Sequence, residues 1–188
     1  MEKKRCDWCL GNDLYIDYHD KEWGVPVHDD REHFEFLVLE SAQAGLSWLT
    51  ILKRREHYRR LYENFDPVRV AEYGPDRVNE MLQDPGIIRN RKKIESSVSN
   101  ARLFLDIVHE FGSFDTYIWG FTEGKVIVNN WKKVSDLPAN SPLSDRITDD
   151  MKKRGFKFLG STIMYAHLQS IGVINDHLTD CFRYKELK

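Results

Sequence analysis

Apolar side chains recur along this chain at spacings of three and four residues, the period of one face of an α-helix. The longest example runs from Ile94 through Val98 and Ala101 to Val108. Its length of about four turns is typical of an amphipathic helix. Further helices are expected over residues 34–41, 48–62, 114–121, 144–153 and 162–171, with short ones opening at 67 and 75. The pattern therefore predicts an all-α fold.

Only short stretches interrupt this pattern. Residues 125–128 could form a brief strand, although no partner strand is evident, and residues 130–142 read as a loop. Residues 155–160 read as a tight connection between two expected helices. A chain of 188 residues without repeats or linkers is long enough to bury one core. We therefore expect a single domain over residues 1–188.

The charge distribution permits nucleic-acid binding without requiring it. The net charge of −2 provides no overall attraction to phosphates. Basic clusters at 53–55, 89–93 and 152–154 could contact phosphates locally, or each could be the solvated face of a helix. No apolar run approaches the roughly 20 residues that span a bilayer, and the first residues lack the apolar segment of a signal peptide. We therefore expect a cytoplasmic protein with no membrane partner.

The cysteines and histidines at the two ends of the chain suggest a metal site. His177 and Cys181 stand four residues apart, which places them on one face of a helix. Cys6 with either Cys9 or His19 would complete the four ligands of a closed, structural zinc site. By spacing alone the set with Cys6 and Cys9 is the better-known zinc pattern. Alternatively, the cysteines are small buried side chains, since disulfides are not expected in a reducing compartment.

Aromatic side chains gather in a polar stretch near the N-terminus. Residues 15–26 are too polar for a typical core segment and read as a loop. Rings in such a loop can stack on a flat ligand, and they attract a cationic one more strongly. Alternatively, the rings close one end of a helix bundle. The aromatic residues concerned are Trp8, Tyr15, Tyr18, Trp23 and Trp48.

One acidic residue falls on an apolar helical face. Glu40 shares that face with Phe36, Leu37 and Ala44. A carboxylate is unfavourable there unless it has a partner. It could accept hydrogen bonds from a ligand in a pocket, or it could form an ion pair or cap a neighbouring helix.

Several longer blocks of sequence are distinctive. They read Arg5-Cys6-x-Trp8, Tyr15-Ile-x-Tyr18-His19-Asp-x-Glu-Trp23-Gly-Val-Pro, Leu39-Glu40-x-x-Gln43-Ala-Gly-Leu-Ser-Trp48, Phe65-Asp-Pro-Val, Gly86-Ile-Ile-Arg89-x-Arg91-x-Lys93-Ile, Lys152-Lys-Arg-Gly-Phe-Lys-Phe158 and Asn175-Asp-His177, followed by Cys181. Together they span nearly the whole chain. They resemble the bacterial 3-methyladenine DNA glycosylase I family, which removes alkylated bases from DNA.

This resemblance implies a fold and a set of site residues. The fold would be that of the helix-hairpin-helix glycosylases, two helical lobes with a DNA cleft between them and a structural zinc site that joins the termini. The zinc ligands would be Cys6, His19, His177 and Cys181, with Cys9 not a ligand. Glu40 would be the catalytic, base-recognising acid, and the base would bind among Trp8, Tyr15, Tyr18, Trp23, Glu40 and Trp48. DNA would contact Lys153, Arg154, Gly155, Phe156, Lys157, Gly160 and Ser161.

The resemblance also implies a reaction. The enzyme would flip 3-methyladenine out of double-stranded DNA and hydrolyse its N-glycosidic bond without a lyase step. Asn175 stands where many other helix-hairpin-helix glycosylases have a catalytic aspartate, and Asp176 beside it is an alternative catalytic residue. The alternatives to this reaction are a zinc-stapled DNA-binding module, a glycosylase for another lesion and a zinc deaminase. The deaminase would need H-x-E and P-C-x-x-C, which the sequence lacks. A monomer is the default expectation.

Overall fold

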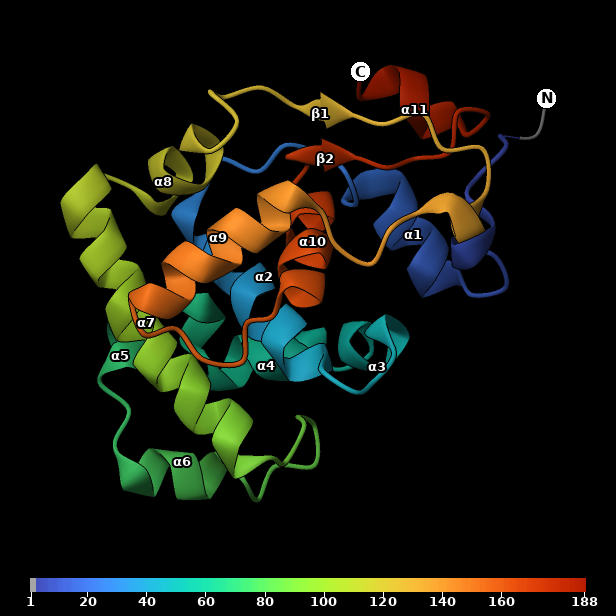
Figure 1. The fold of residues 1–188 in the computed structure, drawn as a ribbon. Coiled ribbons are helices and arrows are strands. Elements are labelled where there is room, and N and C mark those ends of the chain that lie inside the picture. The colour runs from blue at the N-terminus through green and yellow to red at the C-terminus, as the bar shows by residue number, and fades with distance from the viewer. Residues whose placement is uncertain (1–2) are drawn as a thin grey trace.

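The computed structural model describes residues 3–188 and is mostly helical (Figure 1). The helices are α1 (Asp13–Lys21), α2 (Asp30–Gln43), α3 (Trp48–Leu52), α4 (Arg55–Leu61), α5 (Pro67–Ala71), α6 (Pro75–Met81), α7 (Arg91–Phe111), α8 (Phe114–Gly120), α9 (Pro142–Lys153), α10 (Ser161–Ser170) and α11 (Phe182–Glu186). Short 3-10 turns are η1 (Asp7–Cys9), η2 (Glu63–Phe65) and η3 (Val134–Asp136), and the strands are β1 (Ile127–Val128) and β2 (Ile174–Asn175). The expected fold class is therefore confirmed in its main feature, the predominance of helix.

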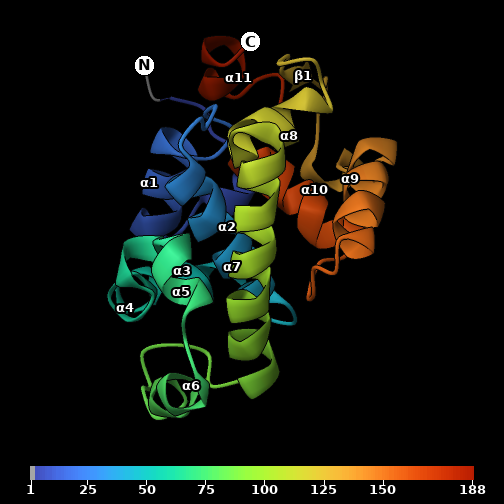
Figure 2. The same cartoon turned by 90° about the vertical axis from the view of Figure 1, so that its left-hand side faces the viewer.

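Helix α2 passes through the centre of the molecule, and the long α7 lies against it (Figure 2). Ten consecutive residues of α2, 33–42, are buried, so the helix is surrounded rather than half-exposed. Phe34 on α2 packs against Phe104 on α7, which stacks on Phe114 of α8 with ring centroids 4.4 Å apart. Helix α10 also packs against α2. This central position holds the side chains of α2 rigidly.

Several expectations about secondary structure are corrected. Residues 15–21 of the stretch expected as a loop belong to α1, whose N-terminal N–H groups are capped by the Asn12 side chain. Residues 125–128 include a strand that does have a partner, because β1 pairs with β2 in parallel, with Ile127 opposite Ile174. A pairing between segments so distant in sequence leaves no local signal. The stripe over 48–62 divides into two helices, α3 and α4, and His177 and Cys181 lie in the connection between β2 and α11 rather than on a helix.

The two ends of the chain meet. The backbone N–H of Phe182 donates to the carbonyl of Lys4, at 2.9 Å, and Lys4 pairs with Asp180. Helix α11 therefore packs beside the N-terminal segment that leads to α1. Within residues 3–188 there is no helix with the length and hydropathy needed to cross a membrane.

Candidate functional site

A pocket of about 230 Å³ lies between α1, α2, α3 and α10. It brings together all six side chains expected in a base pocket. Its lining consists of Trp8, Tyr15, Tyr18, Trp23, Glu40, Gln43, Trp48, Leu137, Ala166, Gln169 and Ser170. The small volume and the flat aromatic walls fit a planar ligand the size of a nucleobase.

Contacts between the rings fix the shape of this pocket. Trp8 from η1 meets Trp23 and Tyr15 edge-to-face, with centroids 5.0 and 5.6 Å apart. Tyr18 from α1 packs on Trp48 from α3 at 5.5 Å. Edge-to-face packing is a favourable arrangement for aromatic pairs. The rings therefore brace one another and keep their positions when no ligand is bound.

Among the residues that the structure describes, Glu40 is the one carboxyl group in the pocket lining. Its side chain is 3% exposed, and its hydrogen-bond partner among the described residues is the Ser170 hydroxyl, at 2.9 Å. Ser170 donates to Glu40 and therefore accepts from the Tyr18 hydroxyl, also at 2.9 Å. Burial raises the pKa of Glu40 to about 8, and the Ser170 hydrogen bond offsets this only in part. Neither the ion pair nor the helix cap considered for Glu40 is found in residues 3–188.

The Tyr15 side chain lines the pocket, and its hydroxyl donates to none of the described residues. Its oxygen accepts the backbone N–H of Leu49 at 3.0 Å, which ties α1 to the start of α3. Because the oxygen is occupied as an acceptor, the hydroxyl proton stays available to a ligand. The pocket therefore offers a donor at Tyr15 and an acceptor at Glu40.

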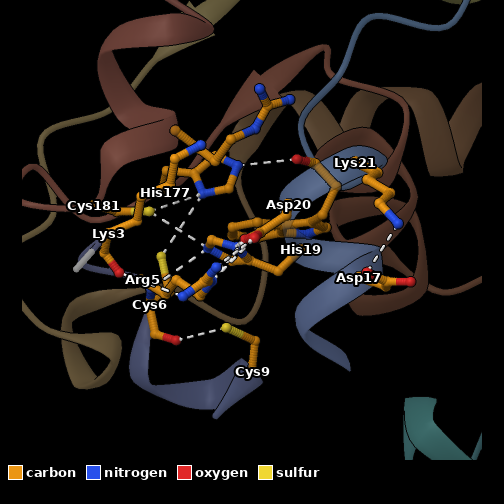
Figure 3. Close-up of polar contacts among 12 residues, drawn as sticks. Lys3, Arg5, Cys6, Cys9, Asp17, His19, Asp20, Lys21, His177 and Cys181 are labelled. Atoms are coloured by element: carbon orange, nitrogen blue, oxygen red, sulfur yellow. Dashed lines mark hydrogen bonds and ion pairs between the residues drawn. The ribbon is translucent and has the colours of Figure 1, made fainter. Parts of the chain in front are cut away.

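Two cysteines and two histidines from both ends of the chain form a second, fully buried group (Figure 3). The ligand atoms of Cys6, His19, His177 and Cys181 all lie within 4.8 Å of one another. Cys181 Sγ is 3.4 Å from His19 Nε2 and 3.6 Å from His177 Nδ1, and Cys6 Sγ is 3.8 Å from the same Nδ1. Zinc–sulfur and zinc–nitrogen bonds of about 2.3 and 2.0 Å place tetrahedral sulfur and nitrogen ligands roughly 3.6 Å apart. The donor set and its spacing fit a zinc ion.

The surroundings of this group also suit a metal. His19 Nδ1 bonds to the Asp20 carboxylate at 2.8 Å, and His177 Nε2 donates to the Trp23 carbonyl at 2.9 Å. Each outer nitrogen thus carries the proton, so the inner nitrogen keeps its lone pair. The hydrogen bond from the Cys6 thiol is the main cause that lowers the pKa of Cys181. A histidine pair oriented by such partners is typical of a metal site.

Cys9 does not belong to this group. Its thiol donates to the backbone carbonyl of Cys6 at 3.1 Å (Figure 3). Of the two ligand sets that the spacing left open, the geometry therefore brings together the one that contains His19.

The connection from α9 to α10 forms a protruding turn. Phe156 is buried beneath it, while Lys157 and Phe158 are exposed at its tip. Gly155 adopts a φ of +103°, in the left-handed region that favours glycine. The Asn100 side chain bonds both the N–H and the carbonyl of Lys157, at 2.9 Å each. Helix α7 thereby fixes the turn with its basic side chain outward.

Helix α10 begins directly after this turn. Gly160 is its N-cap, and no side chain caps it. The N–H groups of the first turn are thus available to an anion. The Ser161 hydroxyl, expected to face DNA, instead bonds Asp145 and Ser144 of α9. The backbone N–H groups remain the stronger candidates here.

The two basic residues before the turn differ. Lys153 is exposed and has no carboxylate partner in the part of the chain that the structure describes. Arg154 pairs with Glu110 at 2.6 Å and with Asp150 at 2.8 Å. Arg154 is therefore already neutralised by its neighbours, whereas Lys153 is available to a phosphate.

A family model for methyladenine glycosylases matches residues 8–184. DNA-3-methyladenine glycosylase 1 of Escherichia coli is 43% identical over 181 residues, which cover 96% of this chain and 97% of that protein. The chain belongs to the methyladenine glycosylase family. It is a glycosylase enzyme, as its sequence resemblance indicated.

Solved structures agree with the family assignment. The crystal structure of a 3-methyladenine DNA glycosylase I matches with a TM-score of 0.92 at 46% identity, covering 95% of this chain and 98% of that one. A variant of such an enzyme, in complex with 3-methyladenine, matches with the same TM-score at 34% identity, covering 95% and 96%. The methyladenine glycosylase fold thus extends over nearly the whole chain.

Sequence analysis missed five of the residues that line the pocket of this methyladenine glycosylase. Ala166, Gln169 and Ser170 lie on one face of α10, at spacings of three and four, and Leu137 comes from the loop before α9. Gln43, one turn after Glu40 on α2, could have been inferred from the helical period. The α10 residues could not, because nothing local shows which face of that helix meets α2.

The raised pKa of Glu40 predicts a pH-dependent stability. Between about pH 4.5 and 8 the folded state holds a proton that the unfolded chain releases, so stability falls as the pH rises through this range. Glu40→Gln removes that effect. We expect the variant to be more stable than the wild type by a few kcal/mol at pH 9 and about equally stable at pH 5. Urea unfolding of both proteins at pH 5 and pH 9 measures this. A stability difference between variant and wild type that is the same at the two pH values would contradict the prediction.

Proposed function

We propose that this glycosylase hydrolyses the N-glycosidic bond of 3-methyladenine in alkylated double-stranded DNA. The base would be flipped from the duplex into the aromatic pocket. The observation that carries the proposal is the buried Glu40 carboxyl group, which has no cationic partner among the described residues and lies in a pocket of aromatic rings. The relatives named for 3-methyladenine support the choice of lesion.

The chemistry follows from the charge of the lesion. Methylation at N3 makes the attached adenine cationic, and the base leaves as a neutral molecule, so little activation is needed. Trp48 and Tyr18 would hold the cationic ring by stacking and cation–π attraction. Glu40, neutral in the empty pocket at neutral pH, would ionise as the cation enters. The pocket then stabilises a positively charged base that an uncharged adenine does not match.

Water would complete the hydrolysis without a lyase step. No lysine is among the pocket residues that the structure describes, so there is no candidate for a Schiff base. Asp176, the alternative general base, is 1% exposed, and each of its oxygens accepts two hydrogen bonds from protein groups. We therefore assign it no direct catalytic role. A borohydride-trapped adduct with abasic DNA would contradict the monofunctional assignment.

We further propose that Cys6, His19, His177 and Cys181 hold one structural zinc ion. Four protein ligands would leave no open position to activate water. The ion would join the N-terminal segment to the segment before α11. Since Trp8 and Trp23 lie near the ligands in sequence, the same tie positions one wall of the pocket.

The remaining assignments concern DNA and assembly. The turn at 155–160 and the start of α10 would act as the hairpin that grips a phosphate, with Lys153 and Lys157 beside it. The enzyme would be a cytoplasmic monomer, one domain of two helical lobes with the cleft between them. These assignments rest on the family resemblance and on the exposed backbone N–H groups of α10.

We predict that Lys157→Ala weakens DNA binding equally for all sequences, because a phosphate contact carries no sequence information. The slope of log affinity against log salt should decrease by about 1. Fluorescence anisotropy with undamaged duplex DNA measures both quantities. Lys125→Ala is the matched control, since Lys125 pairs with Glu123 away from α10. Equal effects of the two substitutions on DNA binding would show that the turn at 155–160 does not contact DNA.

The decisive experiment is release of free base from methylated duplex DNA, resolved by chromatography. Rapid release of 3-methyladenine, with 7-methylguanine retained, would establish the proposed activity. A folded protein that binds DNA but releases no base would instead be a DNA-binding module. Release of a different base from a panel of lesions would identify a sister glycosylase.

A further inference from the structure

Asp176 is a buried carboxylate without a cationic partner among residues 3–188. It accepts four hydrogen bonds of 2.6–2.7 Å from neutral groups. Oδ1 accepts from Asn129 and Trp131, and Oδ2 accepts from Tyr165 and Gln169. A carboxylate offers about four acceptor positions, and all four are filled. Asp176 therefore dictates the orientation of every group around it.

Gln169 connects this carboxylate to the pocket. Its side chain lines the pocket next to Ser170, which bonds Glu40. A carboxylate can only accept, so the amide nitrogen of Gln169 must face Asp176, at 2.7 Å. The amide oxygen Oε1 has no donor within hydrogen-bond distance in the part of the chain that is described. One end of the amide is thus committed to Asp176, and the other remains an unpaired acceptor.

We infer that Gln169 Oε1 is a second acceptor for the exocyclic amino group of the flipped base, and that Asp176 is the positioning residue that orients it. The inference rests on the proposed function. An amino group at carbon 6 of adenine carries two N–H bonds, and Glu40 on α2 and Gln169 on the adjacent α10 both place acceptors in the pocket lining. Each acceptor would take one of them.

This arrangement selects against guanine lesions. Guanine carries an oxygen at carbon 6, and that oxygen would face two acceptors with no proton between them. Such a juxtaposition is unfavourable in a buried pocket. Glu40 alone could escape the conflict by staying protonated, because burial raises its pKa to about 8. The Gln169 amide cannot turn a donor toward the pocket while its nitrogen is bonded to Asp176. Gln169 therefore discriminates between adenine and guanine lesions more strictly than Glu40 does.

Asp176→Asn should reverse the orientation of Gln169. Trp131 can only donate, so the new amide must turn its oxygen toward Trp131 and its nitrogen toward Gln169. Gln169 would then have to accept with Oε1 and present its amino group to the pocket. A donor there suits the guanine oxygen and repels the adenine amino group. A merely structural role for Asp176 would lower both reactions together.

The test compares release of 3-methyladenine and 3-methylguanine from the same methylated duplex under single-turnover conditions. We expect Gln169→Met to lower the ratio of the 3-methyladenine release rate to the 3-methylguanine release rate by about tenfold. The reason is that the lost acceptor binds only the adenine amino group. We expect Asp176→Asn to lower the ratio further. Asn129→Ala is the matched control, since it removes a donor from Oδ1 of Asp176 and leaves Gln169 in place. Its ratio should stay within twofold of the wild type.

The experiment distinguishes a failure of the Gln169 assignment from a failure of the proposed function. A wild-type enzyme that releases 3-methyladenine, together with a Gln169→Met ratio within twofold of its own, would overturn the inference and leave the proposed function intact. A wild-type protein that releases neither base would overturn both. If Asp176→Asn fails to fold, as thermal unfolding and metal content would show, Gln169→Met still decides, because Gln169 is only partly buried.

Discussion

Glu40→Gln should lower the single-turnover rate of 3-methyladenine release by about a hundredfold or more. Glutamine keeps the shape of the side chain and can still accept from Ser170 at 2.9 Å. It cannot supply the negative charge that stabilises a cationic base in a pocket with little water. Removal of one such electrostatic group from a preorganised site typically slows a reaction by about 10²–10³. The measurement is rapid-quench release from methylated duplex DNA at pH 8.

The pH profile separates loss of charge from loss of shape. If the carboxylate is the active form, kcat/KM of the wild type should rise with pH to a plateau near the Glu40 pKa of about 8. The variant should lack this rise. Glu32→Gln is a suitable control, because Glu32 is an exposed carboxylate on the same helix, outside the pocket. Wild-type turnover by Glu40→Gln would show that Glu40 has no catalytic role.

Local sequence patterns predicted the longer helices α2, α7, α9 and α10, since helical period and capping residues act over a few positions. Glu40 could be singled out from the chain alone because the apolar stripe around it showed an acid on a buried face. Its role as the unpaired carboxyl of a pocket could not. That role depends on the absence of an ion-pair partner for Glu40 among the described residues, which only the packing of α1, α3 and α10 around α2 reveals.

The features that sequence reasoning missed depend on contacts between distant segments. Strand β1 was left without a partner because β2 lies 46 residues later. The orientation of Gln169 depends on Asp176, which is held by Asn129 and Trp131 in the strand-to-loop segment. Spacing alone offered two sets of metal ligands; the family resemblance implied the set with His19, and the fold brings that set together. In each case the deciding contact is tertiary, so no local periodicity encodes it.

Cys181→Ser should remove the zinc ion and lower the melting temperature by about 10–20 °C. Metal binding couples to folding, and isolated zinc-finger peptides gain about 10–16 kcal/mol from it. This chain has its own helical core, so we expect a smaller loss of about 5 kcal/mol. For a chain of this size each kcal/mol shifts the midpoint by about 2–4 °C. Elemental analysis and calorimetry of the purified variant measure the two effects.

Cys9→Ser provides a closely matched control for Cys181→Ser. Cys9 is equally buried and lies three residues from a ligand, yet its thiol donates to the Cys6 carbonyl. A serine hydroxyl can make the same hydrogen bond, so metal content and melting temperature should be nearly unchanged. Equal metal content in the two variants would contradict the assigned ligands. Loss of zinc without loss of stability would mean that the hydrogen bonds of Cys6, His19 and His177 hold the termini together on their own.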